Sequence, residues 1–461
     1  MNNLNLAEIK KTTFETINSL TIHGIPSLFR SKFLFTKIVW LLLTLTSLGL
    51  SIHFILITLN EYFEFNVTTQ VRLIDSNLPF DFPTITFCNK NKFSSNQSLK
   101  YLIHLLNSHN LSNSNDQKGL NLTYNNKNVF KTYPAHLVFQ DFDMKTRRLI
   151  TKSLDEMLIY AGFDMRDLNM GDLTWIYNKE YGNCYQFNSN GSFKTKKSSS
   201  GSGFKLDLLL NDEPIEIYNQ NNFKGLWLSI HEKNKNSYND LDDIIQILPG
   251  VETNIILERS EFQKYPKPFS NCESEEKLNS KYYEQMKVLN YQYSQSICLD
   301  FCKYDLLLKR NESCPDLDSS IRLPNKVNCS FHYSKNINID ELERNYINNF
   351  YNLSIYDQEC YDNCPLECKK VKFTHFVNIL PYQDDVLEEM QNNRLIKLNK
   401  SFEKRSSVKN NLIRLIIKFG SMNYIRYVES PTMNLFDLIS NLGGTLGLFL
   451  GIFLFIFKII K

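Results

Sequence analysis

A glycine-rich apolar stretch lies near the end of the 461-residue sequence, where residues 441–455 read NLGGTLGLFLGIFLF. Gly443, Gly447 and Gly451 recur at every fourth position, so a helix would carry all three on one face. Glycine weakens a helix, but small residues at this spacing let another backbone approach closely. Carbonyl oxygens left accessible there can replace the hydration shell of an ion. A phosphate-binding loop is excluded because no Gly-Lys-Ser/Thr follows.

The ten cysteines all fall between Cys88 and Cys368. An even number confined to one block indicates a disulfide framework formed in an oxidising compartment. Cys298 and Cys302 lie four residues apart, and the same spacing recurs at residues 360, 364 and 368, so the two rows could bond as a ladder. Zinc ligation is the alternative, which the absence of CxxC pairs disfavours. The spacing alone selects no pairing.

Neither catalysis nor nucleic-acid binding is predicted. The sequence contains no obvious nucleophile–base set, metal cluster or phosphate loop, so we expect no enzyme, metal or cofactor. The nearest candidate nucleophile, Cys184, belongs to the cysteine block. Net charge is only +3 and the basic residues are dispersed, which argues against a nucleic-acid partner.

Two uncharged apolar stretches predict membrane spans. As a helix, residues 38–59 would be about 33 Å long at 1.5 Å per residue, enough to cross the hydrocarbon layer. This stretch begins too far into the chain and is too long for a cleaved signal peptide, so we expect it to be retained. Residues 438–457 form the second candidate. The alternative, that both are buried helices of a soluble protein, is disfavoured because they flank a cysteine-rich block.

Charges beside the spans predict the orientation. Basic residues precede the first span, acidic residues follow it, and lysines close the chain after the second: Lys10, Lys11, Arg30, Lys32 and Lys37; Glu61 and Glu64; Lys458 and Lys461. The positive-inside rule places both termini in the cytoplasm. The predicted parts are a cytoplasmic segment 1–37, a span 38–59, an extracellular domain 60–432, and a pre-pore segment with the second span 433–460.

The predicted extracellular block also contains every Asn-x-Ser/Thr sequon, as expected for a glycoprotein. The candidate acceptors are Asn66, Asn96, Asn110, Asn121, Asn190, Asn311, Asn328, Asn352 and Asn399. Residues 82–87 and 224–230 are rich in β-branched and aromatic residues and predict strands, whereas residues 278–308 lack Gly and Pro and are predicted to be largely helical. The mixture predicts an α+β domain. SSSGSG at 198–203 predicts a flexible loop.

Five motifs, in order along the chain, resemble the degenerin/epithelial sodium channel family, which includes acid-sensing and peptide-gated channels. They are TIHGIPSLF at 21–29, FPTITFCNKNKF at 82–93, YGNCYQFN at 181–188, the segment from Pro249 to Cys272, and the glycine stretch. The resemblance implies a plasma-membrane trimer, homomeric or heteromeric, whose subunits have two transmembrane helices around a large disulfide-rich α+β ectodomain of finger, thumb, knuckle, palm and β-ball.

The resemblance also implies a disulfide pairing and gating residues. The implied pairs are Cys88–Cys184, Cys272–Cys368, Cys298–Cys364, Cys302–Cys360 and Cys314–Cys329. His23 and Gly24 match the His-Gly motif of the family, a cytoplasmic gating element, although an ordinary turn before the span is the alternative. Tyr62 matches the place of tyrosines that couple ectodomain to pore, although an interfacial aromatic is an equal alternative. His53, within the first span, is a weaker candidate for a proton-responsive group.

The implied pore residues depart from the family pattern. The matching positions are Asn441, Gly443, Gly444, Gly447, Leu448, Gly451, Ile452 and Phe453. The family has Gly-x-Ser at the narrowest point, where Phe453 stands here, and Asn441 and Ile459 replace two acidic residues. An apolar passage resists wetting, so a homotrimer would conduct poorly, unless the helix is rotated so that Phe453 faces lipid.

The sequence therefore predicts a subunit of a ligand- or force-gated, sodium-preferring cation channel in the lipid bilayer, working with partner subunits that have intact filters. The alternative function is a non-conducting cell-surface receptor or modulatory subunit that keeps the architecture with a degenerate pore. The sequence does not identify the gating stimulus.

Overall fold

The computed structural model describes residues 31–75, 79–91, 94, 144–178, 181–196, 198, 201–210, 224–233, 244–274, 281–288, 292–309, 357–382 and 410–451. These residues fall into two compact units. The first contains helix α3 (Leu34–Phe63), helix α15 (Leu435–Gly451) and the segment 264–270. The second contains most of the strands and all disulfides of the described part.

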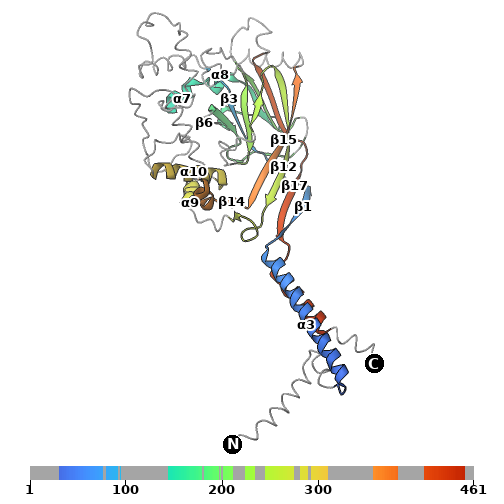
Figure 1. Cartoon of the computed structure of the whole chain (residues 1–461). Helices are drawn as coiled ribbons and strands as arrows, with labels where there is room; N and C mark the ends of the chain where they lie inside the picture. The colour runs from blue at the N-terminus through green and yellow to red at the C-terminus, as the bar shows by residue number, and fades with distance from the viewer. Residues whose placement is uncertain are drawn as a thin grey trace, which may run out of the picture. The chain divides into compact units, whose positions relative to one another are not determined.

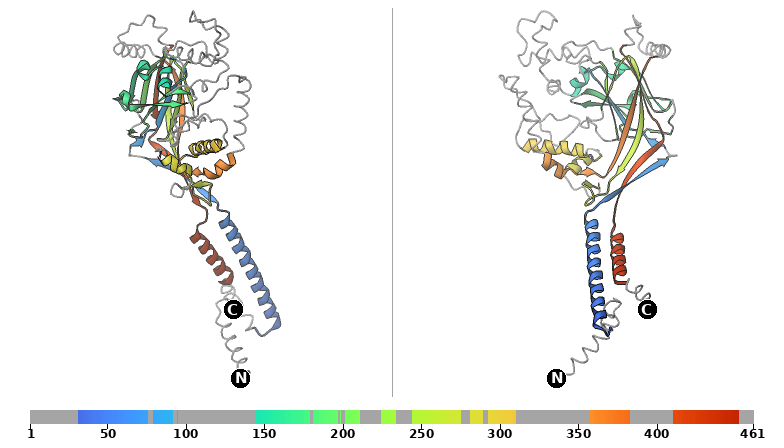
Figure 2. Two further views of the ribbon diagram at one scale, coloured as in Figure 1. Left: turned by 90° about the vertical axis from the view of Figure 1, so that its left-hand side faces the viewer. Right: turned by 45° about the vertical axis from the view of Figure 1, so that its right-hand side comes forward.

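In the first unit, α3 extends the predicted span by four residues at each end. It is the one helix in the described ranges that is long and apolar enough to cross a membrane. α15 lies beside α3, as the right-hand view of Figure 2 shows. α15 begins three residues before the second predicted span, and residues 452–457 of that span lie outside the described part. The second span therefore stays a prediction.

The second unit is built on two sheets, labelled in part in Figure 1. The larger sheet, in spatial order, comprises β1 (Val67–Asp75), β17 (Asn423–Pro431), β12 (Val251–Gln263), β16 (Leu412–Phe419), β9 (Phe204–Leu209), β4 (Leu158–Phe163) and β5 (Arg166–Asp167), with β15 (Lys369–Pro381) on the other edge of β12. The smaller sheet comprises β11 (Ile245–Ile247), β10 (Leu226–His231), β3 (Thr84–Asn89), β7 (Gly182–Phe187) and β6 (Leu173–Asn178).

Further short elements complete the described part. They are β2 (Phe80–Asp81), β8 (Lys194–Thr195), β13 (Cys272–Glu273), β14 (Leu366–Glu367), α7 (Met144–Ile150), α8 (Leu154–Met157), η1 (Met170–Asp172), α9 (Lys281–Val288), α10 (Gln295–Lys309) and α12 (Asp357–Asn363).

One hydrophobic core joins the two sheets. Phe187 of β7 stacks on Phe204 of β9 with ring centroids 4.5 Å apart, and both are fully buried. Alternate residues of the central strands β9, β12 and β16 add aliphatic side chains to the same core, as strands that bury one face must do. The strands predicted at 82–87 and 224–230 are confirmed as β3 and β10, which pair antiparallel. The described part of the second unit is β-rich, and α7, α8, α9, α10 and α12 are its helices.

The stretch predicted to be largely helical, 278–308, contains α9 and α10, which confirms the prediction in the described residues. Residues 292–294 between these helices are not helical, and the buried Tyr293 donates a hydrogen bond from its hydroxyl to the carbonyl of Pro365, 2.6 Å away. The described residues of the loop predicted at 198–203 contain no helix or strand, and the end of this loop is held: Gly203 has φ +88° and donates from its backbone N–H to Asp164 Oδ1 at 2.7 Å. A side chain there would meet the backbone of Ile417.

Candidate pore helix and its connection to the strands

Helix α15 starts with a reciprocal capping box. The backbone N–H of Asn434 donates to Asp437 Oδ2 at 3.0 Å, and the backbone N–H of Asp437 donates to Asn434 Oδ1 at 2.9 Å. These bonds satisfy donors that a helix start otherwise leaves free, and the Asp437 carboxylate interacts favourably with the helix dipole. The position at which the helix begins is thus fixed directly after β17.

The glycine face of α15 does not pack on α3. A Cβ built on Gly443, Gly444 or Gly447 would meet no heavy atom within 4 Å. Contact with α3 uses another part of α15: the Phe449 ring stacks on Phe54 at 5.4 Å between centroids, and Ser47 Oγ donates to the Phe449 carbonyl at 2.6 Å. Among the described residues of one chain, the part of this face around Gly443 and Gly447 is therefore open.

The remaining predicted pore and gating residues differ in what the structure describes. Asn441 is exposed and lies one turn before Gly444 on α15. Gly451 is the last described helical residue, and Ile452 and Phe453 lie outside the described residues. His23 and Gly24 also lie outside them. In the described part of the chain, no group of three or more His, Cys, Asp or Glu side chains is placed to hold a metal.

Aromatic residues connect the end of α3 to the segment 264–270. Phe65, two residues beyond the helix, has φ +51° and meets the Phe269 ring edge to face at 5.3 Å. Tyr62 contacts Phe65 at 6.3 Å between ring centroids. Tyr265 packs edge to face on Phe269 at 5.0 Å. Sequence reasoning selected Tyr62 and missed Phe65, whose only local signal is its place in the aromatic run YFEF at 62–65.

Hydrogen bonds tie the chain after α3 to the chain before α15. The backbone N–H of Thr432 donates to the carbonyl of Asn66 at 2.9 Å, and the hydroxyls of Thr68 and Ser430 are 3.2 Å apart. The backbone N–H of Tyr265 donates to Glu429 Oε2 at 3.0 Å. The two helices and the segment 264–270 therefore meet in one bonded junction.

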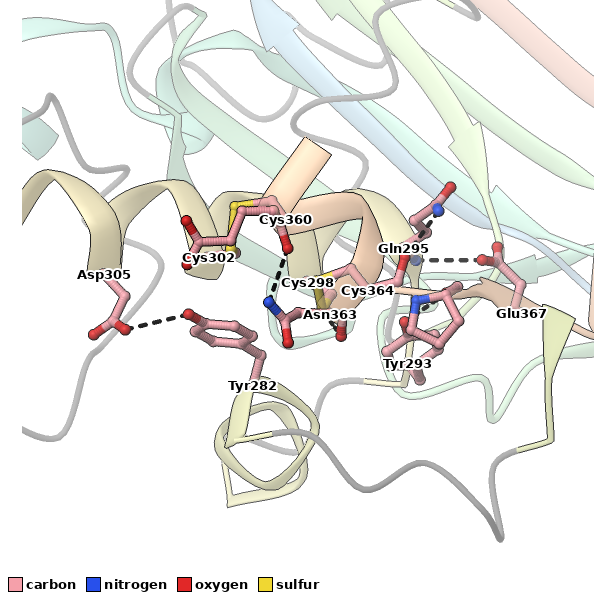
Figure 3. Close-up of a disulfide and its surroundings, with 12 residues drawn as sticks. Tyr282, Tyr293, Gln295, Cys298, Cys302, Asp305, Cys360, Asn363, Cys364 and Glu367 are labelled. Carbon is pink, nitrogen blue, oxygen red and sulfur yellow. Dashed lines mark hydrogen bonds between the residues drawn. A yellow bond between two sulfur atoms is a disulfide. The ribbon is translucent and has the colours of Figure 1, made fainter. Parts of the chain in front are cut away.

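The described residues contain four disulfides, with the pairing that the family resemblance implies. They are Cys88–Cys184, Cys272–Cys368, Cys298–Cys364 and Cys302–Cys360. The first joins directly opposed residues of β3 and β7. The last two join α10 to the chain at α12, the ladder in Figure 3. Cys314 and Cys329 lie outside the described residues. Because every described cysteine is bonded, these thiols are unavailable as metal ligands.

Polar side chains reinforce this helical cluster. Tyr282 Oη donates to Asp305 Oδ2 at 3.2 Å, as Figure 3 shows. Burial, and then the neighbouring Asp305 carboxylate, raise the pKa of Tyr282 to about 12. Burial likewise raises the pKa of Tyr293, with a smaller contribution from Glu367. Both phenols are thus kept neutral as donors.

The asparagines of the motif YGNCYQFN serve structural roles that sequence reasoning missed. Asn183 Nδ2 donates to the carbonyls of Arg147 and Arg148 at 3.0 and 3.1 Å, where α7 ends. Asn188 has φ +58°, and its Nδ2 donates to the carbonyl of Phe82 at 2.6 Å. The motif therefore joins its own strand to α7 and to the motif FPTITFCN.

A long apolar helix, a second helix with an open glycine face and a disulfide-rich strand domain agree with the class that the motifs predict, a membrane protein of the ion-channel type. The family model described as the amiloride-sensitive sodium channel matches residues 16–455. The chain therefore belongs to the amiloride-sensitive sodium channel family, the degenerin/epithelial sodium channel family to which its motifs point.

Curated relatives agree. The chain is similar to the bile acid-sensitive ion channel of Homo sapiens, 23% identical over 96% of this chain and 83% of the relative. It is also similar to acid-sensing ion channel 1C of Danio rerio, 24% identical over 94% and 79%. Epithelial sodium channel subunit gamma-2 of Xenopus laevis is 26% identical over 64% of this chain and 43% of the relative. Members of the family are plasma-membrane ion channels that assemble as trimers, and their ectodomains are rich in disulfides and strands.

Proposed function

We propose that this chain is a subunit of a ligand- or force-gated, sodium-preferring cation channel in which α15 lines the pore. The open glycine face of α15 carries this proposal, because a Cβ on Gly443, Gly444 or Gly447 would meet no atom within 4 Å in the described part of the chain. In a trimer, three such faces would turn toward one axis, where small residues allow close approach and leave carbonyl oxygens available to a cation. The neighbours are copies of this chain or related subunits.

In the proposed arrangement, residues 38–59 and 438–457 both cross the membrane and both termini are cytoplasmic. The domain 60–432 is extracellular, in agreement with its disulfides. The finger, thumb, knuckle, palm and β-ball divisions, and glycosylation of some of its sequons, belong to the same proposal.

The proposed gating path runs through the aromatic junction. A displacement of the segment 264–270 moves Phe269, which packs on Phe65 directly after α3. The bond between Tyr265 and Glu429 carries the same displacement toward α15. Tyr62 supports Phe65 from the helix end. His23 and Gly24 would act on the cytoplasmic side.

The proposed filter lies at Gly451, Ile452 and Phe453, with Asn441 near the outer mouth. A phenylalanine in place of the filter serine makes this part of the pore apolar and harder to wet. We therefore expect little current from the homomer and more from a trimer with subunits whose filters contain serine. The same substitution supports the second candidate function, a non-conducting receptor or modulatory subunit.

Cysteine accessibility tests the pore assignment. The chain is expressed alone, and with a relative that has an intact filter, in cells of low background conductance. A charged thiol reagent should block the current of Gly447→Cys channels and leave that of Gly49→Cys channels unaffected. Gly49 is the matched control because it is an equally open glycine but lies on α3, which does not line the proposed pore. Phe453→Ser should increase the homomeric current.

The outcomes separate the two candidate functions. Homomeric sodium current blocked through Gly447→Cys excludes the non-conducting receptor. Silence alone, with altered currents on co-expression, favours the modulatory subunit. Silence in every pairing despite delivery to the cell surface overturns the channel proposal.

A further inference from the structure

Two of the nine sequons lie wholly within the described residues, and they differ in structure. Asn190-Gly191-Ser192 forms the turn between β7 and β8. Asn66-Val67-Thr68 connects the end of α3 to β1. Both asparagines are exposed, so exposure alone does not distinguish the two sites. The hydrogen bonds around each asparagine distinguish them.

Hydrogen bonds to Asn188 fix the turn that contains Asn190. Asn188 Oδ1 accepts a hydrogen bond from the backbone N–H of Phe193 at 2.9 Å. The backbone N–H of Gly191 donates to the Asn188 carbonyl at 3.1 Å, and Gly191 has φ +67°, a conformation that favours glycine. The turn is therefore a fixed scaffold, and Asn190 and Ser192 project from it into solvent.

Within this scaffold the Asn190 side chain adopts an Asx turn. Its Oδ1 accepts a hydrogen bond from the backbone N–H of Ser192 at 3.1 Å. The bond uses the carbonyl oxygen of the amide and holds the side chain over the residue that supplies the sequon hydroxyl. Asn190 Nδ2 has no hydrogen-bond partner among the described residues, so the nitrogen that would be modified is exposed and unengaged.

At Asn66 the side-chain nitrogen, rather than the oxygen, forms the hydrogen bond. Asn66 Nδ2 donates to Glu64 Oε2 at 2.8 Å, and the backbone carbonyl of Asn66 accepts from the backbone N–H of Thr432 at 2.9 Å. The sequon hydroxyl, on Thr68, is 3.2 Å from Ser430 Oγ. Asn66 also follows α3 by only three residues. α3 is about 45 Å long at 1.5 Å per residue, enough to span the bilayer with its headgroups, so Asn66 would lie at the membrane surface.

We propose that Asn190 carries an N-linked oligosaccharide and that Asn66 does not. This inference rests on the proposed extracellular placement of the strand domain. The co-substrate is an oligosaccharide joined to a polyprenol through a diphosphate. The amide nitrogen of Asn190 bonds to the anomeric carbon of the first sugar and loses one proton to a base, while the bond from that carbon to the diphosphate breaks. The polyprenyl diphosphate leaves with the bonding electron pair.

Mass spectrometry of the full-length chain, purified from eukaryotic cells, tests the proposal. Reduced and alkylated protein is treated with peptide N-glycosidase in heavy-oxygen water and digested with trypsin. The peptide of residues 180–194 should then contain a labelled aspartate at position 190. A sample kept in the same heavy-oxygen water without glycosidase controls for spontaneous deamidation of Asn190, which precedes Gly191. That reaction also takes an oxygen atom from water, so only the label that depends on the enzyme reports a glycan. The peptide containing Asn66 should be unlabelled.

Substitutions sharpen the test on gels. Ser192→Ala should lose one glycan from the protein, although it keeps the Asx turn, which uses the backbone nitrogen of residue 192. Ser192→Thr should retain the glycan. Asn66→Gln should migrate like the unsubstituted protein, because no glycan is lost.

Three results would overturn the inference or its basis. Label at other sequons with none at Asn190 overturns the inference and leaves the proposed function intact. Label at Asn66 overturns its second half. Absence of glycan from every sequon contradicts the extracellular placement itself, and with it the proposed function.

Discussion

Replacing Gly447 by alanine should have opposite effects on a single subunit and on the trimer. In one chain the added methyl group meets no atom within 4 Å, so it costs nothing in packing. It should stabilise α15 by about 1 kcal/mol, the difference in helix propensity between alanine and glycine. If the glycine faces of three subunits meet at an axis, the methyl group overpacks that contact by about 1–3 kcal/mol per copy.

Three copies of each term give the magnitude for the assembly. The overpacking cost is about 3–9 kcal/mol for the trimer. The gain in helix stability, about 3 kcal/mol for three copies, is present in the separated subunits too, so it does not offset this cost when the trimer dissociates. Gly49→Ala is the matched control, because Gly49 lies in α3 and its Cβ would also meet nothing within 4 Å. Gly49→Ala should gain the same helix stability without the cost of overpacking.

The assay compares how the two variants keep the trimer together. Size-exclusion chromatography of fluorescently tagged protein in increasing denaturing detergent should show Gly447→Ala trimers dissociating earlier than Gly49→Ala trimers. Sodium current through co-expressed trimers should fall in the same order. Equal resistance to detergent and equal currents for the two variants would refute the reasoning that neighbouring subunits cover the glycine face.

Three further predictions concern residues outside α15. Asp207→Asn should lower the free energy of unfolding by about 1.5–3 kcal/mol, because it removes the buried carboxylate that accepts two hydrogen bonds from the partly buried Arg414, at 2.9 and 3.0 Å. Thermal unfolding in detergent measures this, and an unchanged melting temperature would contradict it. A double-mutant cycle of Phe65→Ala and Phe269→Ala on the opening equilibrium should give a coupling energy of about 0.5–1.5 kcal/mol, whereas additive single effects would argue against the aromatic junction. Burial raises the pKa of Tyr185 to about 12, above the unfolded value of about 10. The contribution of the neutral Tyr185 to the free energy of unfolding is therefore complete below pH 10 and is lost as the pH rises toward 12. Tyrosinate absorbance followed alongside unfolding should show this loss, and Tyr185→Phe should remove it.

Local pattern was enough to predict several elements. The charge-free run at 38–59 is as long as a bilayer is thick, and the structure has a helix there. β-branched and aromatic residues at 82–87 and 224–230 predicted two strands that exist and pair. Cysteine spacing predicted a ladder but no pairing, because many partners satisfy the same spacing. Only the family resemblance selected the four pairs that the structure contains.

The sequence by itself determined which residues are apolar, which prefer strands, and which glycines share a helix face, since these properties depend on neighbours in the chain. Only the tertiary structure decided that Phe65 rather than Tyr62 meets Phe269, and that Tyr293 bonds to Pro365 between α9 and α10. It also decided which side of α15 packs on α3 and which remains open. The physical reason is that these outcomes depend on contacts between segments far apart in the sequence, and local periodicity carries no information about the partner.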